Sequence, residues 1–184
     1  MPVMSSDRLA AVLADGYVAG LEQLSLDEVR SRRHECQELE VALSYARRIV
    51  QGRLDIIHAE LERRASGSGR SDASDLVDRL KEGEILGDHA RPPGLGRLPT
   101  LMEPGDESDE FLAEANEVAH EDVLVSLPDR GDDDVRALGD TLESIERGLS
   151  DTRRKVFDRI DIFQFEIVRR YKTGAANADS LLSS

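Results

Sequence analysis

An apolar stripe runs through residues 25–64 at the spacing of one face of an α-helix. Its members are Leu26, Val29, Cys36, Leu39, Leu43, Ala46, Val50, Leu54, Ile57 and Leu61. Ser25, followed three residues later by Glu28, has the pattern of a capping box at a helix start. The Gly- and Ser-rich run at 65–69 ends the pattern. The sequence therefore predicts one long amphipathic helix over residues 25–64.

A second apolar stripe predicts another long helix over residues 132–172, and its three leading aspartates suit the positive end of a helix. The two apolar seams consist of Leu39, Leu43, Ala46, Val50 and Leu54, and of Ile145, Leu149, Thr152, Val156 and Ile160. Because such helices bury their seams against each other, we predict an all-α coiled-coil hairpin. The long connection permits either direction, and we favour antiparallel packing because it relates equivalent residues by a pseudo-two-fold axis.

The rest of the chain has weaker patterns. Residues 1–24 are mixed, with one short helical turn expected at 7–13. Residues 65–131 are acidic and hold most of the prolines, which predicts a partly disordered linker with short helices at about 72–82 and 108–118. The tail from 173 to 184 is rich in Gly, Ala and Ser and is expected to be flexible.

The two predicted helices are copies of one another. A shift of 106 residues aligns 27–64 with 133–170, and 15 of these 38 positions are identical. Shared helical composition explains a handful of identities, but it does not explain why spaced polar residues recur in the same order. Duplication of one helix is the simplest account.

A polar stripe lies one residue beyond each seam. Its members are Glu40, Ser44, Arg47, Gln51 and Asp55 in the first helix, and Glu146, Ser150, Arg153, Phe157 and Asp161 in the second. The steps of 4, 3, 4 and 4 keep each set within about 80° of helix surface and over about 22 Å of length. Serine is a mediocre helix former, so its return at the matching place indicates a contact.

The side chains of the stripe suit guanine and phosphate. Arginine makes bidentate hydrogen bonds to the guanine O6 and N7 edge or to phosphate, and aspartate accepts from the guanine N1 and N2 groups. Serine and glutamine add adaptable donors and acceptors. Glu40 is expected either to accept from a sugar or amino group or to orient Arg47. The alternative interpretation is a solvated salt-bridge cluster on the helix surface.

Composition and charge narrow the function classes. Aromatic residues make up 4% of the chain and charged residues 34%, which suits long helices. The formal charge of −14 disfavours direct binding to DNA or anionic membranes and favours a basic protein surface. Cys36, the single cysteine, is expected to be a packing residue. We find no signal peptide pattern and no apolar run that would span a membrane, so we expect a cytoplasmic protein.

An enzyme is not expected. The histidines at 34, 58, 89 and 120 have no metal-ligand spacing, and the chain has neither a nucleophile elbow nor a Gly-rich phosphate loop. Glu40 and Asp55 lie about 22 Å apart along one helix, which is too far for paired carboxylates to act together. We therefore predict no catalytic residues, no metal and no cofactor.

At the polar stripes the sequence resembles the RsiG family, the cyclic-di-GMP-dependent anti-sigma factors of sporulating actinobacteria. The family signature is E-x3-S-x2-R-x3-Q-x3-D on each of two helices, and residues 40–55 match it in full. Residues 146–161 match it except at Phe157, which takes the place of the glutamine. Phe157 is expected to pack on the seam rather than to stack on a base.

The resemblance implies a function and a partner. Members bind a dimer of cyclic di-GMP between the two helices, and the loaded protein then sequesters WhiG, a sigma factor of the flagellar and sporulation class. By resemblance, the nine matching residues of the two stripes are ligand-binding, with Phe157 leaving the second copy weaker. Two other functions stay open: a structural coiled-coil scaffold without nucleotide binding, and a nucleotide sensor with a different partner.

Overall fold

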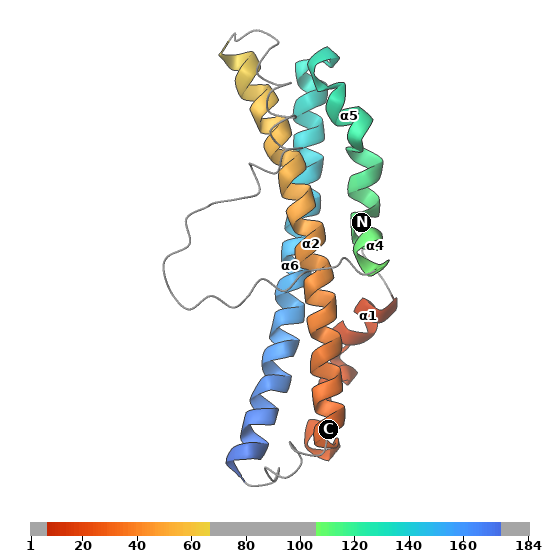
Figure 1. The fold of residues 1–184 in the computed structure, drawn as a ribbon, viewed down its shortest axis with the longest axis vertical. Helices are drawn as coiled ribbons and strands as arrows, with labels where there is room; N and C mark the ends of the chain where they lie inside the picture. Colours follow the sequence, from red (N-terminus) through yellow and green to blue (C-terminus); the bar gives the residue numbers. More distant parts are fainter. Residues whose placement is uncertain (1–6, 67–105, 174–184) are drawn as a thin grey trace. The chain divides into compact units, whose positions relative to one another are not determined.

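The computed structural model describes residues 7–66 and 106–173, and both ranges are helical (Figure 1). The element order is α1 (Asp7–Leu13), η1 (Asp15–Val18), η2 (Leu21–Gln23), α2 (Leu26–Ala65), α4 (Asp106–Val118), α5 (Glu121–Val125), η3 (Leu127–Asp129) and α6 (Asp132–Lys172). No strand occurs in these two ranges. The prediction of an all-α protein is confirmed. The helix predicted at about 72–82 lies outside the described residues.

Helix α2 begins at the capping box. The Ser25 backbone N–H donates to the Glu28 carboxylate at 2.7 Å, and the Glu28 N–H donates to Ser25 Oγ at 3.2 Å. The bonds from Ser25 lower the pKa of Glu28, because they favour its charged form. Arg63 and Arg64 lie in the last turn, where positive charge suits the helix dipole.

Helix α6 carries acidic residues in its first turn and basic residues in its last, the same arrangement as α2. It also continues through Gly139, a residue type that weakens isolated helices. Gly139 is buried, and a Cβ added there would lie 3.4 Å from Cγ2 of Ile57 on α2. Tertiary packing between the helices therefore outweighs the low helix propensity of this residue.

The described chain divides into two compact units, and α2, α4 and α6 each contribute to both. Unit 1 comprises residues 7–46, 106–111 and 148–173, and it joins the first half of α2 to the second half of α6. The two helices run in opposite directions, because Arg33 donates to Gln164 at 2.6 Å and Arg153 donates to Glu40 at 2.9 Å. The core of unit 1 includes Leu9, Val12, Val29, Cys36, Leu39, Leu43, Phe111, Leu149, Val156 and Phe163.

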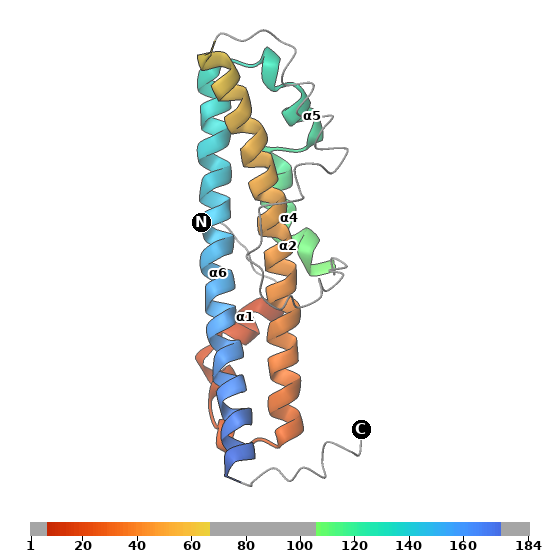
Figure 2. The same cartoon turned by 60° about the vertical axis from the view of Figure 1, so that its left-hand side comes forward.

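The N-terminal elements complete unit 1. Helix α1 lies beside α2 and α6 (Figure 2). Arg8 on α1 pairs with Glu35 and Glu38 of α2, and Arg159 of α6 donates to the Leu13 carbonyl at 2.9 Å. Cys36 is fully buried, and burial raises the pKa of its thiol to about 11. It is therefore a packing residue, as predicted.

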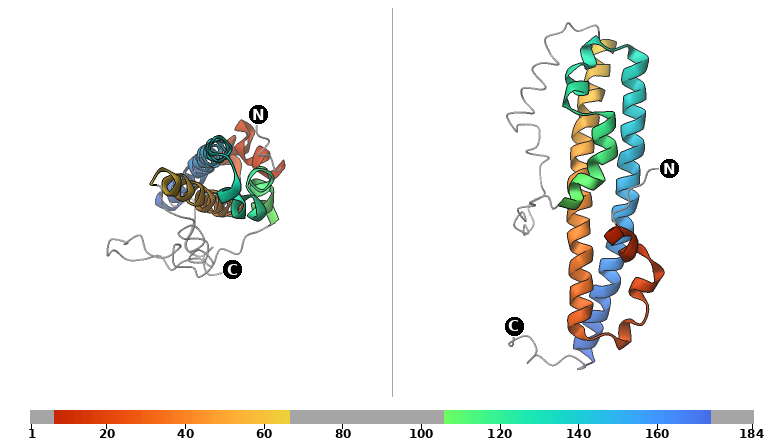
Figure 3. Two further views of the ribbon diagram at one scale, coloured as in Figure 1. Left: turned by 90° about the horizontal axis from the view of Figure 1, so that it is seen from above. Right: turned by 90° about the vertical axis from the view of Figure 1, so that its right-hand side faces the viewer.

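Unit 2 comprises residues 47–66 and 112–147, and it joins the second half of α2 to the first half of α6. These halves also run in opposite directions, since His58 lies 3.7 Å from Glu143 and Arg64 lies 2.5 Å from Asp132. Helix α4 runs beside α2 (Figure 3), and Arg53 of α2 donates to Asn116 of α4 at 2.5 Å. The core of unit 2 includes Val50, Leu54, Ile57, Leu112, Ala115, Ala119, Leu127, Val135, Leu142 and Ile145.

The internal repeat extends beyond the two long helices. The turn η2 at Leu21–Gln23 precedes α2, and the turn η3 at Leu127–Asp129 stands 106 residues later before α6. Upstream, α1 at Asp7–Leu13 corresponds by the same shift to the second half of α4. The sequence in these segments has diverged, and the shared element order shows what the pattern of identities did not. The duplicated piece is therefore a short helix, helical turns and one long helix.

Candidate functional site

The predicted site residues of each long helix are divided between the two units. Unit 1 contains Glu40, Ser44, Ser150, Arg153 and Asp161, and unit 2 contains Arg47, Gln51, Asp55 and Glu146. Each set therefore draws residues from both α2 and α6. The apolar seams that position them are buried as predicted, except that Thr152 and Ile160 are half-buried.

The unit 1 cluster centres on Glu40. Arg153 Nε donates to Glu40 Oε1 at 2.9 Å and to Ser44 Oγ at 2.8 Å. The Ser44 hydroxyl in turn donates to Glu40 Oε1 at 2.6 Å. Ser44 thus accepts from the arginine and donates to the carboxylate, which explains why a hydroxyl is used at this helix position.

The unit 2 cluster centres on Glu146. Arg47 Nε donates to Glu146 Oε1 at 2.9 Å, and Gln51 Nε2 donates to the same oxygen at 3.0 Å. The arginine side chain is 32% exposed and the glutamate 19%, against 32% and 18% for Arg153 and Glu40. The two glutamate–arginine pairs are therefore matched in distance and in access to solvent.

Orientation of Arg47, one of the two roles expected for Glu40, is not what the structure shows. Each glutamate instead binds the arginine of the other repeat, Glu40 with Arg153 and Glu146 with Arg47. The reason is geometric: residues seven apart on one helix are separated by about 10.5 Å of rise, while a facing antiparallel helix brings its arginine within hydrogen-bond distance.

Phe157 does not pack into the buried seam, which corrects the sequence-based interpretation. Its side chain is 38% exposed, and the Arg153 guanidinium lies 4.7 Å from its ring centroid in a cation–π contact. Gln51, at the equivalent place in the first repeat, hydrogen-bonds a carboxylate. The two repeats thus hold their arginines differently, one by a ring face and the other beside an amide.

The remaining predicted residues are Asp55, Asp161 and Ser150. Asp55 and Asp161 are exposed, and neither forms an ion pair with another described residue. Ser150 is half-buried on α6 in unit 1. Exposed carboxylates of this kind are free to accept hydrogen bonds from N–H groups of a ligand.

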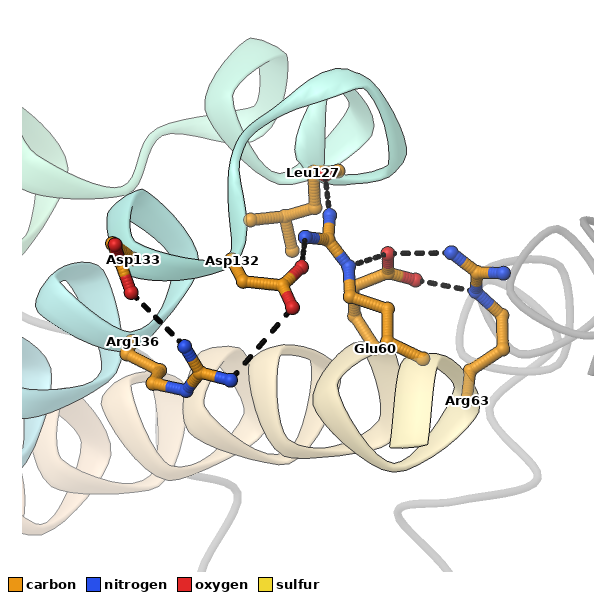
Figure 4. Close-up of polar contacts among 7 residues, drawn as sticks. Glu60, Arg63, Leu127, Asp132, Asp133 and Arg136 are labelled. Carbon is orange, nitrogen blue, oxygen red and sulfur yellow. Dashed lines mark hydrogen bonds and ion pairs between the residues drawn. The ribbon is translucent and has the colours of Figure 1, made fainter. Parts of the chain in front are cut away.

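A second pair of clusters escaped the sequence analysis. Glu60 is 3% exposed and accepts bonds from Arg63 and Arg64 within α2 (Figure 4). Glu166 is 7% exposed and accepts from Arg169 and Arg170 within α6. Hydrogen bonds from Arg169 and then Arg170 lower the pKa of Glu166 to about 2. In the sequence, both clusters correspond to an E-x2-R-R motif that recurs at the shift of 106 residues, and this recurrence could have identified them.

Comparison with known families identifies the family of this chain. A family model described as RsiG-like matches residues 15–84 and 121–184, ranges that include both polar stripes and both E-x2-R-R motifs.

The chain belongs to the RsiG-like family. This is a family of regulatory anti-sigma factors and not of enzymes. A search of curated proteins found no match. Within the described ranges, no helix is long and apolar enough to cross a membrane.

Proposed function

We propose that this RsiG-like protein is an anti-sigma factor that binds cyclic di-GMP, as a dimer of the nucleotide, and in that state sequesters a WhiG-like sigma factor. One observation carries the proposal: a matched glutamate–arginine pair links α2 and α6 in each unit. A purely structural pair requires only opposite charges, yet Ser44 in unit 1 and Gln51 in unit 2 add further bonds to these carboxylates.

The geometry of Arg153 favours recognition of a guanine edge or a phosphate. Both hydrogen bonds to Glu40 and Ser44 leave from Nε, and the ring of Phe157 supports one face of the guanidinium. A guanidinium held in this way directs its two terminal nitrogens to a ligand with little loss of side-chain entropy. Bidentate bonding to guanine O6 and N7 is the strongest use of such a fork.

The duplication favours a ligand made of equal halves. The clusters around Glu40 and Glu146 present nearly the same chemistry, and cyclic di-GMP offers each of them an identical guanine and phosphate. Its phosphates carry negative charge, which Arg47, Arg153 and the neighbouring Arg48 and Arg154 would offset. Asp55 and Asp161 would accept from the guanine N1 and N2 groups.

Coupling to the sigma factor follows from linkage. A ligand that contacts both helices favours one arrangement of the pair, and a partner that prefers this arrangement then binds more tightly when ligand is present. The chain carries a formal charge of −14, which complements the basic elements with which a sigma factor recognises promoter DNA. A falling nucleotide concentration would release the sigma factor to RNA polymerase in the cytoplasm.

Isothermal titration calorimetry tests the proposal directly. Purified protein is titrated with cyclic di-GMP, alone and in the presence of a WhiG-like sigma factor, and the sigma factor is titrated with and without nucleotide. We expect saturable nucleotide uptake and tighter sigma binding in its presence. If no nucleotide is taken up in either arrangement, the proposal fails and a scaffold role is favoured. Uptake without any effect on the sigma factor would instead favour a sensor with another partner.

A further inference from the structure

We infer that Arg64 and Arg170 are positioning residues, which fix the axial register of α2 against α6 and thereby align the glutamate–arginine pairs. The inference concerns residues outside the polar stripes, and its consequence for the ligand rests on the proposed function. We call the two groups the end clasps: Glu60, Arg64, Leu127 and Asp132 in unit 2, and Glu166, Arg170, Leu21 and Leu24 in unit 1.

The unit 2 clasp uses all three nitrogens of Arg64. Nε donates to Glu60 Oε1 at 2.6 Å within α2, Nη1 donates to Asp132 Oδ1 at 2.5 Å at the start of α6, and Nη2 donates to the Leu127 carbonyl at 2.6 Å in η3. Figure 4 shows Glu60, Leu127 and Asp132 converging from these three elements. One side chain thus ties the end of α2 to the turn that starts α6.

The unit 1 clasp repeats this design at the shift of 106 residues. Arg170 Nε donates to Glu166 Oε1 at 2.7 Å, while its terminal nitrogens donate to the Leu24 and Leu21 carbonyls at 2.7 and 2.6 Å. Leu21 and Leu127 are equivalent positions of the repeat. Two of the three bonds therefore recur in both copies, while the third acceptor is Asp132 in unit 2 and the Leu24 carbonyl in unit 1.

The buried carboxylates make the clasps rigid. Arg63 holds Glu60 through two bonds of 2.7 Å, and Arg169 holds Glu166 through bonds of 2.7 and 2.8 Å. Each carboxylate is therefore fixed within its own helix, and it in turn fixes the arginine that reaches across to the other helix. A donor anchored in this way has little freedom to follow a sliding neighbour.

The apolar seam needs such a device. Contacts between Leu, Val and Ala side chains are non-directional, so a seam of helical spacing tolerates displacement along the axis. A slip of one turn moves the facing residues by about 5.4 Å, which would break bonds as short as the 2.9 Å contact between Arg47 and Glu146. The clasps carry directional bonds to fixed backbone carbonyls, and only one register satisfies them.

Unit 2 contains a natural position for measuring its register. A Cβ at Gly139 would lie 3.4 Å from Cγ2 of Ile57, so the two positions are in direct contact across the helices and suit a test of cross-linking between cysteines. The parent protein for the experiment is Ile57→Cys with Gly139→Cys, in a Cys36→Ala background. Into it we introduce Arg64→Met, and as a matched control Arg63→Met, which removes an arginine from the same carboxylate but retains the three bonds of Arg64.

We expect Arg64→Met to slow disulfide formation in a glutathione buffer on the order of tenfold, because two charge-assisted bonds between the elements are lost. Arg63→Met should change the rate much less. In the reduced state, Arg64→Met should also weaken cyclic di-GMP uptake, and closing the disulfide should restore it. A cross-link far from Arg64 can restore nucleotide uptake only if the role of Arg64 is to hold the axial register of the two helices.

Two results would overturn the inference. One is a helical Arg64→Met protein that forms the disulfide at the rate of the parent, and the other is an equal fall in that rate with Arg63→Met. If Arg64→Met does not fold by circular dichroism, Arg64→Lys replaces it, since lysine keeps the charge but not the three-way fork. Its cross-linking rate should fall below that of the parent, and a parental rate would again contradict the clasp. Failure of the parent to take up nucleotide would refute the proposed function alone, because the cross-linking rates do not depend on ligand.

Discussion

The double substitution Arg47→Ala with Arg153→Ala separates ligand recognition from helix packing. Both arginines are 32% exposed, and the carboxylates they bind are 19% and 18% exposed. Partly solvated pairs of this kind stabilise a fold by up to about 1 kcal/mol each. The double variant should therefore lose at most about 2 kcal/mol of folding free energy, which lowers Tm by no more than roughly 8 °C in a chain of this size.

The expected effect on ligand binding is larger. A bidentate arginine contact to guanine contributes about 1–3 kcal/mol, so loss of two such contacts costs about 2–6 kcal/mol of binding free energy. The Kd for cyclic di-GMP should then rise from about thirtyfold to more than ten-thousandfold. Calorimetry measures the Kd, and circular dichroism on the same samples checks that the helices persist.

The matched control is Arg136→Ala with Arg147→Ala, which removes the same charge from side chains that are 57% and 71% exposed. At physiological salt its Kd should stay within about threefold of the parent, because exposed charges are screened. Retention of parental affinity by the Arg47 and Arg153 variant would refute the assignment of these residues. An equal loss in the control would show that net charge, and not contact geometry, governs uptake.

Three further outcomes are expected. Phe157→Gln restores the family signature in the second repeat. We expect it to bind cyclic di-GMP more tightly, because the new amide can bond Glu40 as Gln51 bonds Glu146. Weaker binding by calorimetry would indicate that the contact between the Phe157 ring and Arg153 contributes more. Glu166 has a folded pKa of about 2, below its usual 4.5, so the stability it contributes is fully present above pH 4.5 and is lost as the pH falls toward 2. The Tm difference between the parent and Glu166→Gln should be largest at neutral pH and should shrink below pH 4.5; a difference that does not vary with pH would contradict this assignment. Gly52→Ala should raise the free energy of unfolding by about 0.5–1 kcal/mol in urea titrations, because a Cβ there meets no atom within 4 Å among the described residues and alanine is the better helix former; destabilisation would reveal a contact at this position.

Local patterns in the sequence were sufficient for the elements and the seams. The capping box at Ser25 and Glu28 forms the predicted hydrogen bonds, and Val50 and Leu149 of the apolar seams are fully buried. These features depend on residues within a few positions of one another, so helical periodicity and capping chemistry define them. The shift of 106 residues likewise required only the sequence, and it identified Glu40 and Arg153 as members of equivalent stripes.

The partners of those side chains were decided by tertiary structure. From the sequence, Glu40 was expected either to accept from a ligand group or to orient Arg47 of its own helix, whereas the folded chain pairs it with Arg153 of the other repeat. Phe157 was expected in the seam and instead lies partly exposed beside the same arginine. A helix of known periodicity still has free choices of direction, rotation and axial position against its neighbour. Contacts across helices, including the end clasps of Arg64 and Arg170, exist only once those choices are made.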